Sequence, residues 1–333
     1  MNEQILSMLS AASSLRIACV GDIMLDCFVN GEARRISPEA PVPVFLESST
    51  DQMLGGAANV ARNIRAYGAN VDLHGIVGDD DDAATLRELA GEADLTHALV
   101  TDASRCTTTK TRFVAQGQQL LRSDRECKSW VDSTTEKQLL RGVMKPLLSS
   151  SVLVLSDYAK GCLTRSLVSD VIEKANTCGI PVVVDPKGSD ISRYRGAWII
   201  TPNEGEFHVL SGNEDTDVDS MTDSARKLMD EHQIANIMIT LGSRGILLVT
   251  PVQTYSFPTV AKQVFDVSGA GDSVVAALAV SLGCGLSVRQ ACYLANLAGG
   301  IAVEKSGTAV VLFDEIIDRL MVAEDLQLSE THV

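Results

Sequence analysis

Five short apolar runs, spread between residues 16 and 242, constrain the fold of this 333-residue chain more than any other feature. Each run ends in a polar or small residue, and helical segments alternate with the runs. Near-continuous apolar strands alternating with helices are typical of a parallel sheet covered on both faces. Ligands of such sheets bind beyond the carboxyl ends of the strands. The sequence therefore predicts an α/β fold with a cleft at the ends of the runs 16–22, 152–157, 181–185, 198–203 and 237–242.

Two stretches interrupt this alternation. Residues 27–48 and 104–123 carry alternating β-forming residues, with prolines in the first stretch and threonines in the second. We expect short antiparallel strands in both, inserted between sheet and helix, which together form a lid over the cleft. The acidic run Asp79–Asp82 is expected to begin a helix, because acidic side chains stabilise the positive end of the helix dipole.

The stretch Asp266–Ser273 predicts an anion-binding turn at the start of a buried helix. Gly269, Ala270 and Gly271 are small, so backbone N–H groups can point freely at the positive end of the helix dipole. Asp272 follows directly. A carboxylate would repel a bound phosphate, but it is well suited to take a proton from a hydroxyl that attacks the phosphate. These residues favour phosphoryl transfer to an alcohol, although the same turn is also a common way to begin a helix.

Two well-known phosphate-binding motifs do not explain this turn. The Rossmann pattern requires Gly or Ala at its sixth position within a first βαβ unit, whereas this chain has Val274 there, close to its C-terminal end. No G-x-x-x-x-G-K-[ST] sequence occurs anywhere, which excludes a P-loop enzyme.

The net charge of −15 argues against nucleic acid and anionic membrane surfaces as partners. The same charge would repel ATP or a sugar phosphate, so an anionic substrate requires a local group of basic side chains. The eight cysteines show no C-x-x-C pair and no zinc-ligand spacing, which indicates reduced thiols. The N-terminus lacks a signal-peptide pattern, and no apolar run is long enough for a membrane span. We therefore expect a cytoplasmic protein.

A second glycine-rich stretch, Gly55–Asn63, follows the first lid segment. Paired glycines at a helix start let a ligand approach the backbone, and Asn59 can both donate and accept hydrogen bonds. With Asp26 upstream and the Gly269–Asp272 turn downstream, these residues resemble the two signatures of the ribokinase-like (pfkB) carbohydrate kinases. The resemblance covers nearly the whole chain. It implies a ribokinase-like fold, with a central, mostly parallel sheet flanked by helices and a small β lid.

Longer strings resemble a narrower group of that family, the kinases of D-glycero-β-D-manno-heptose 7-phosphate. These strings are residues 36–44, 155–161, 185–188, 193–197 and 201–203. They imply ATP-dependent transfer of the γ-phosphoryl group to the anomeric hydroxyl, which gives the 1,7-bisphosphate for ADP-heptose and lipopolysaccharide core synthesis. In some members a nucleotidyltransferase domain follows the kinase. We expect residues 1–333 to be a single kinase domain, the separate kinase form.

The resemblance also implies roles in the chemistry. Asp272 would be the base, and Gly269, Ala270 and Gly271 would stabilise charge on the transferred phosphoryl group. The family's N-x-x-E motif, which organises Mg²⁺ and its waters, is matched by Asn203 and Glu206. A monovalent cation, K⁺, often lies beside the anion-binding turn in this family, and it would sit at Asp266, Ser268 and the loop 302–307.

Further residues are assigned to the two substrates by the same resemblance. The nucleotide would be bordered by Thr240, Gly242, Ser243, Gly245 and, near the adenine, Asn296. Sugar hydroxyls would be held by Asp26, Gly55, Gly56 and Asn59, with Asp157 and Lys160 at a neighbouring strand end.

Because the chain is strongly acidic, binding of the 7-phosphate requires several basic side chains close together. The candidates are Arg34 and Arg35 on the first lid segment, Lys110 and Arg112 on the second, and Lys187 after a strand-end acid. Arginine suits bidentate recognition of phosphate. An exposed arginine is also a common way to protect the edge of a sheet.

Three functions remain open at this point. The first is the heptose 7-phosphate kinase. The second is a kinase of the same fold with another acceptor, such as a fructose phosphate or ribose; a neutral acceptor would not need the basic side chains. The third is a non-catalytic sugar-phosphate sensor, against which the retained base and N-x-x-E motif argue. The family resemblance also implies a homodimer formed through the lid strands.

Overall fold

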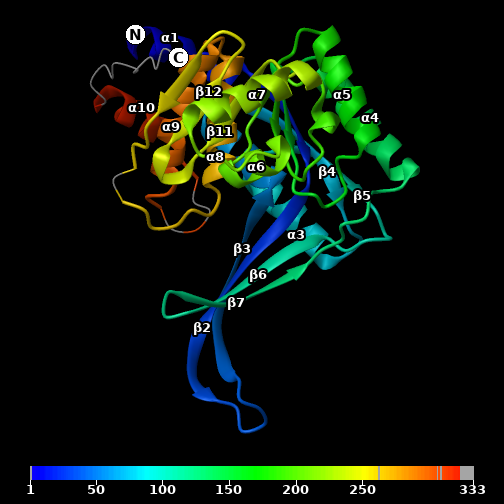
Figure 1. Ribbon diagram of the computed structural model, residues 1–333. Helices are drawn as coiled ribbons and strands as arrows, with labels where there is room; N and C mark the ends of the chain where they lie inside the picture. Colours follow the sequence, from blue (N-terminus) through cyan, green and yellow to red (C-terminus); the bar gives the residue numbers. More distant parts are fainter. Residues whose placement is uncertain (1, 262, 306, 308–309, 323–333) are drawn as a thin grey trace.

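The computed structural model describes residues 2–261, 263–305, 307 and 310–322, and over these residues a nine-stranded sheet forms the centre of the molecule (Figure 1). The strand order is β13-β12-β11-β10-β9-β8-β1-β4-β5. The seven strands from β11 to β5 are parallel to their neighbours, and β12 and β13 are antiparallel. The strands are β1 (Arg16–Gly21), β4 (Asn70–Val77), β5 (Thr96–Thr101), β8 (Val152–Ser156), β9 (Val182–Asp185), β10 (Ile199–Ile200), β11 (Asn236–Thr240), β12 (Ile246–Val249) and β13 (Thr254–Phe257).

All five predicted strands are present, and they are neighbours in the sheet as β11-β10-β9-β8-β1. Their side chains are almost all buried, because helices cover both faces of the sheet. The predicted mostly parallel α/β sheet is therefore confirmed, and the carboxyl ends of these strands lie along one edge.

Helices on the two faces enclose two apolar cores. One core includes side chains of α1 (Asn2–Leu9), α2 (Ala57–Ala66), α3 (Asp81–Glu92), α8 (Ala270–Gly283), α9 (Val288–Ala302) and α10 (Phe313–Val322). The other includes α4 (Ser133–Leu147), α5 (Arg165–Thr177), α6 (Glu204–Ser211) and α7 (Val218–His232). Three short 3-10 turns are η1 (Ala12–Ser14), η2 (Ile191–Tyr194) and η3 (Gly242–Arg244).

Helix α8 is the buried helix that the sequence predicts after Asp272. Every residue from Asp272 to Ser281 is buried, as expected for a helix that is apolar on all sides. It packs against α2, so the two glycine-rich signatures of the sequence lie at neighbouring helix starts. Among the described helices, none combines the length and the apolar character needed to cross a membrane.

The lid is a separate four-stranded sheet that projects away from the body (Figure 1). Its order is β3-β2-β6-β7, formed by β2 (Ile23–Ile36), β3 (Pro43–Gly56), β6 (Thr108–Ala115) and β7 (Gln118–Arg125). The prediction of short, antiparallel strands is wrong in two respects. Strands β2 and β3 have 14 residues each, and β2 pairs with β6 in parallel. The parallel pair arises because both strands leave the same edge of the central sheet, one after β1 and the other after β5.

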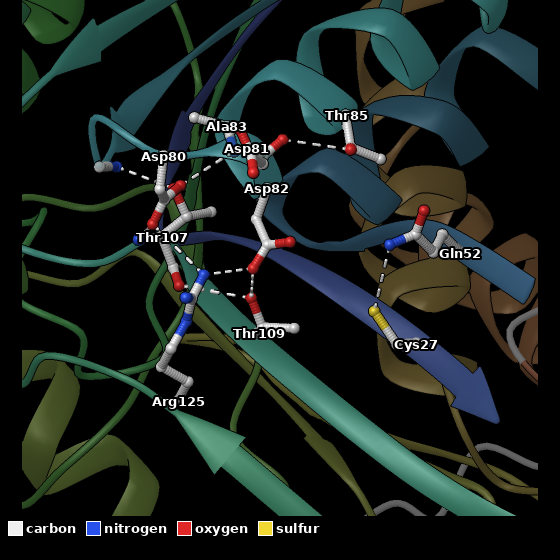
Figure 2. Close-up of polar contacts among 11 residues, drawn as sticks. Cys27, Gln52, Asp80, Asp81, Asp82, Ala83, Thr85, Thr107, Thr109 and Arg125 are labelled. Carbon is white, nitrogen blue, oxygen red and sulfur yellow. Dashed lines mark hydrogen bonds and ion pairs between the residues drawn. The ribbon is translucent and has the colours of Figure 1, made fainter. Parts of the chain in front are cut away.

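The base of the lid is tied to the start of α3 (Figure 2). Asp80 caps α3 and also accepts hydrogen bonds from the backbone N–H and the hydroxyl of Thr107, at 2.9 and 2.6 Å. Asp82 accepts a hydrogen bond from Thr109 at 2.8 Å. Arg125 of β7 contacts both carboxylates. The acidic run begins a helix, as predicted, and its charges in addition fix two lid strands to the body.

Candidate active site

A cleft of about 300 Å³ lies at the carboxyl edge of the central sheet, where the lid joins the body. Its walls come from three places: lid strands β2, β3 and β6, the carboxyl ends of β8 to β11 with the residues that follow them, and the start of α8. The predicted site residues that line it are Asp26, Gly56, Lys110, Arg112, Lys187, Asn203, Glu206, Thr240, Gly269, Gly271 and Asp272. One cleft thus unites residues from distant parts of the sequence.

A second pocket of about 330 Å³ adjoins the cleft and shares Thr240, Gly271 and Val274 with it. Its lining is mainly apolar and includes Val264 and Val267. The predicted nucleotide residues that line it are Thr240, Gly242, Ser243, Gly245 and Asn296, together with Ala270 of the anion-binding turn. An apolar pocket that opens onto a polar cleft at a helix start is suited to a flat aromatic base with a phosphate chain.

Asp272 lies in the first turn of α8 and is only 7% exposed. Gly269 precedes the helix with φ of 75°, a backbone conformation that favours glycine, and no side chain caps the helix. The first N–H groups of a helix have no partner within it. Gly269 and Gly271 line the cleft, so this helix start, which has no side-chain cap, faces the space where a ligand would bind.

Both carboxylate oxygens of Asp272 accept hydrogen bonds. The amide of Asn59 donates to Oδ2 at 2.5 Å, and the hydroxyl of Tyr158 donates to Oδ1 at 2.5 Å. Asn59 is itself held, since Arg62 donates to its Oδ1 at 2.9 Å. Asn59 therefore contacts the proposed base from α2, rather than lining the cleft.

Burial raises the pKa of Asp272 from 3.8 to about 6, and the hydrogen bonds from Tyr158 and Asn59 partly oppose this rise. A carboxylate with a pKa near 6 is a stronger base than an exposed aspartate and is still mostly ionised at pH 7. These are the properties that general base catalysis requires.

Asp26, Lys110 and Arg112 form the polar wall on the lid side. Asp26 and Lys110 are register partners on β2 and β6, and Arg112 donates to Asp26 at 2.6 Å. Gly55 makes this arrangement fit, because a Cβ there would lie 2.2 Å from Oδ2 of Asp26. The ammonium of Lys110 is 3.4 Å from Asp124, at the outer limit of a hydrogen bond. Two basic side chains thus line the lid side of the cleft in a strongly acidic protein.

The N-x-x-E motif forms a capping box at the start of α6. Asn203 and Glu206 exchange hydrogen bonds between side chain and backbone, at 2.9 and 3.0 Å. The free Oε1 of Glu206 lies 2.6 Å from the ammonium of Lys187. Lys187 thus lines the cleft as predicted, and in this structure it is paired with Glu206 of the N-x-x-E motif.

The oxygen donors at this end of the cleft fit Mg²⁺. Asp185, Asn203 and Glu206 line the cleft together. In the described part of the chain, no three His, Cys, Asp or Glu side chains form a metal-binding group. A hard cation that keeps several waters and binds substrate phosphates suits such a sparse set of carboxylates.

Asp266 precedes the anion-binding turn and organises the loop around it. Its Oδ1 accepts the N–H of Ser268 at 2.9 Å, and its Oδ2 accepts the N–H of Gly307 at 3.0 Å. Burial raises the pKa of Asp266, but these hydrogen bonds more than offset that effect, so the pKa lies below its ordinary value. An ionised carboxylate at this place is compatible with the predicted monovalent cation.

Asp157 and Lys160 do not line the cleft. Asp157 is buried, accepts the hydroxyl of Tyr194 at 2.7 Å and pairs with Arg193 at 3.0 Å. Lys160 pairs with Glu126 at 2.6 Å. Both residues stabilise loops at the strand ends. The prediction that they contact substrate is therefore not supported. Sequence alone could not show this, because a strand-end acid that holds a loop looks the same in sequence as one that binds a ligand.

Arg34 is also absent from the cleft. It lies far along β2, where its side chain is 69% exposed and pairs with Glu32 at 2.7 Å. Its predicted contact with the sugar phosphate is not made within one chain. The reason is the length of β2, which extends this part of the lid well beyond the body (Figure 1).

Tyr158 and Asp185 line the cleft, although the sequence analysis gave neither of them a role. Tyr158 follows β8 and contacts Asp272, and Asp185 ends β9. Burial, followed by the charges of Asp272 and Glu206, raises the pKa of Asp185 well above its ordinary range. Asp185 ends one of the runs whose ends the sequence places at the cleft, so its position was expected, but no role was assigned to it. A tyrosine in a loop carries no comparable signal.

Comparison with solved structures agrees with this fold. Phosphofructokinase-2 from Escherichia coli superposes with a TM-score of 0.75 at 20% identity, covering 92% of this chain and 99% of that one. Ribokinase from Arabidopsis thaliana, solved with ribose and ATP, gives a TM-score of 0.72 at 19% identity, covering 92% and 98%. At these identities the likeness shows the ribokinase-like fold alone.

Sequence comparison establishes the family. Residues 14–314 match the model of the pfkB family carbohydrate kinases, and this chain belongs to that family. Such sugar kinases use ATP and Mg²⁺ in general. The chain is 43% identical over 319 residues to the bifunctional protein HldE of Paramagnetospirillum magneticum, and 42% identical over 314 residues to that of Shewanella amazonensis. These alignments cover 95% and 94% of this chain, but only 65% of each relative.

Proposed function

We propose that this protein transfers the γ-phosphoryl group of ATP to the anomeric hydroxyl of D-glycero-β-D-manno-heptose 7-phosphate. The product would be the 1,7-bisphosphate, an intermediate for ADP-heptose and the lipopolysaccharide core. The observation that carries the reaction type is Asp272, buried at an uncapped helix start with a pKa of about 6. The substrate is supported by the heptose-kinase strings of the sequence and by the similarity to HldE proteins.

In the proposed reaction, Asp272 takes the proton of the anomeric hydroxyl while the oxygen of that hydroxyl bonds to the γ-phosphorus. The bond between that phosphorus and the β–γ bridging oxygen breaks, and ADP leaves with the electron pair. The N–H groups at Gly269–Gly271 would stabilise the charge on the transferred oxygens. Asp272 accepts the proton but is not expected to bind the phosphate itself, because its negative charge would repel the phosphate oxygens.

Asn203 and Glu206 would hold Mg²⁺ through its waters, with Asp185 close by. When bound, the ion would neutralise charge on the nucleotide phosphates. Lys187 would add a positive charge on the same side of the cleft, next to Glu206. The apolar second pocket would take the adenine.

The sugar would lie between Asp272 and the lid. Asp26 would accept hydrogen bonds from its hydroxyls, and Lys110 and Arg112 would bind the 7-phosphate. Lys110 is the freer of the two to turn toward a phosphate, because its contact with Asp124 is long.

We further propose that K⁺ binds beside the loop held by Asp266, and that residues 1–333 act as a single kinase domain. Turnover in KCl compared with tetramethylammonium chloride at equal ionic strength tests the first point. If the protein is equally active without K⁺, the proposed K⁺ site is refuted. A cytoplasmic location, and the absence of nucleic-acid and membrane partners, stay predictions.

A homodimer through the lid is the proposed assembly. The lid exposes large apolar side chains that a second copy would cover: Ile36, Val42, Leu46, Leu120 and Leu121. Exposed apolar patches of this kind mark interaction surfaces. Sedimentation equilibrium tests the assembly directly, and a monomer at micromolar concentration would contradict it.

The test of the proposed function is ADP release with MgATP across four acceptors: heptose 7-phosphate, unphosphorylated heptose, fructose 6-phosphate and ribose. We expect turnover confined to heptose 7-phosphate. Turnover of ribose or fructose 6-phosphate would keep the chemistry of Asp272 and overturn the substrate. Tight binding of sugar phosphate without turnover of any acceptor would favour a sensor.

A further inference from the structure

We propose that Tyr158 is a positioning residue: its hydroxyl holds the Asp272 carboxylate in the orientation that receives the acceptor's proton, and stabilises its negative charge. This inference rests on the proposed role of Asp272 as the base. Tyr158 itself lines the cleft, and its hydroxyl lies 2.5 Å from Oδ1 of Asp272.

The loop that carries Tyr158 is fixed by a buried carboxylate. Asp22, which directly follows β1 and is 2% exposed, accepts three backbone N–H groups of this loop. The donors are Tyr158 at 2.9 Å, Lys160 at 3.0 Å and Cys162 at 3.0 Å. The sequence placed Asp22 at the cleft as one of several strand-end acids. In the structure it anchors the loop, so the Tyr158 hydroxyl has a defined position.

The two donors to Asp272 come from opposite sides. Asn59 reaches Oδ2 from α2, and Tyr158 reaches Oδ1 from the loop after β8. Each carboxylate oxygen can accept two hydrogen bonds, so a lone pair on each oxygen remains for the acceptor hydroxyl. Two fixed donors thus prevent rotation of the carboxylate without blocking its function as a base.

Tyr158 can act only as a donor here. Burial and the charge of Asp272 raise the pKa of its hydroxyl well above the ordinary value, so it keeps its proton. Other charged groups also face Asp272: Asp26 of β2 raises its pKa, Arg62 of α2 lowers it, and Asp185 lies at the end of β9. Removing the Tyr158 hydroxyl leaves all of these in place.

The test is the pH dependence of kcat/KM for heptose 7-phosphate in Tyr158→Phe, which removes one oxygen and keeps the ring. Without that hydrogen bond the carboxylate is harder to ionise, so the midpoint of the acidic limb should rise by about one pH unit. At pH 6 this shift alone lowers kcat/KM about fivefold, and the loss should shrink toward pH 9. Ionisation of the substrate phosphate affects both proteins equally.

A matched control is available in Tyr194→Phe. Tyr194 donates to Asp157 at 2.7 Å, so this variant also loses a buried tyrosine–carboxylate hydrogen bond, but the carboxylate is not that of the base. Its acidic limb should have the wild-type midpoint. If Tyr158→Phe keeps the wild-type midpoint, or if Tyr194→Phe shifts it equally, the positioning role is refuted.

A second substitution covers the case in which Tyr158→Phe does not fold, as judged by ATP binding. 3-Fluorotyrosine placed at position 158 keeps the hydroxyl and makes it a stronger donor, so the midpoint should move to lower pH. No movement would refute the proposal. The proposed function itself is tested separately: if Asp272→Asn still turns over, the base assignment fails, whatever Tyr158 does.

Discussion

Replacing Asp272 by asparagine should abolish turnover and, at the same time, make the protein more stable. Asparagine has the shape of the carboxylate but cannot take a proton, and removing a positioned general base typically costs 10² to 10⁴ in rate, as an order of magnitude. The amide can still satisfy both neighbours, because its oxygen can accept from Asn59 and its nitrogen can donate to the hydroxyl of Tyr158.

The gain in stability follows from the buried charge. The pKa of Asp272 is about 6 in the folded protein, against 3.8 for the group in water. The folded state therefore binds the proton more tightly, so stability falls as pH rises from about 4 to about 6 and stays low above that. Ionisation of the buried Asp272 lowers the free energy of unfolding by about 3 kcal/mol at pH 7 and by about half of that at pH 5. With an unfolding entropy of about 0.7 kcal/mol/K for a chain of this length, 3 kcal/mol corresponds to about 4 °C.

Thermal unfolding of wild type and Asp272→Asn at pH 5 and pH 8, without ligands, measures this gain. The variant should melt about 4 °C higher at pH 8 and about 2 °C higher at pH 5. Asp170→Asn is the control, because Asp170 is exposed on α5 and its charge stays in water in both states. An equal gain at both pH values, no gain, or retained turnover would refute the reasoning.

Three further predictions concern the cleft and the lid. Lys110→Ala should raise KM for heptose 7-phosphate at least tenfold and leave KM for ATP nearly unchanged, because a charge-assisted contact to phosphate is lost. Lys187→Ala should instead raise KM for ATP, since Lys187 pairs with Glu206; an effect mainly on the sugar would return it to the sugar pocket. Arg125→Ala should speed amide hydrogen exchange in β6 and β7 while lowering the free energy of unfolding by less than about 1 kcal/mol. Arg122→Ala, at an equally exposed position on β7, should leave the exchange rates unchanged. Equal exchange rates in the two variants would refute the anchoring role of Arg125.

The central sheet could be predicted from sequence because buried parallel strands leave a continuous apolar signal. The run 152–157 became β8 and the run 237–242 became β11, each within two residues of the expected bounds. The lid was harder. Its two segments could be located by their alternation, but the parallel pairing of β2 with β6 joins residues about 80 positions apart, and no local pattern encodes it.

The candidate site was predictable where small residues and acids stand in a fixed pattern. Gly269, Gly271, Asp272 and the pair Asn203 and Glu206 line the cleft, and Ala270 lines the adjoining pocket. Strand-end acids were not distinguishable from one another: Asp22 and Asp157 hold loops, while Asp185 lines the cleft. Their difference depends on which partners the fold supplies.

The most direct test of the central claim is the product formed from D-glycero-β-D-manno-heptose 7-phosphate and MgATP, observed by ³¹P NMR. The account predicts one new resonance of a glycosyl phosphate on the anomeric oxygen, one ADP formed per product, and neither with Asp272→Asn. A phosphate on any other oxygen, or an unchanged spectrum with the wild-type protein, would contradict it.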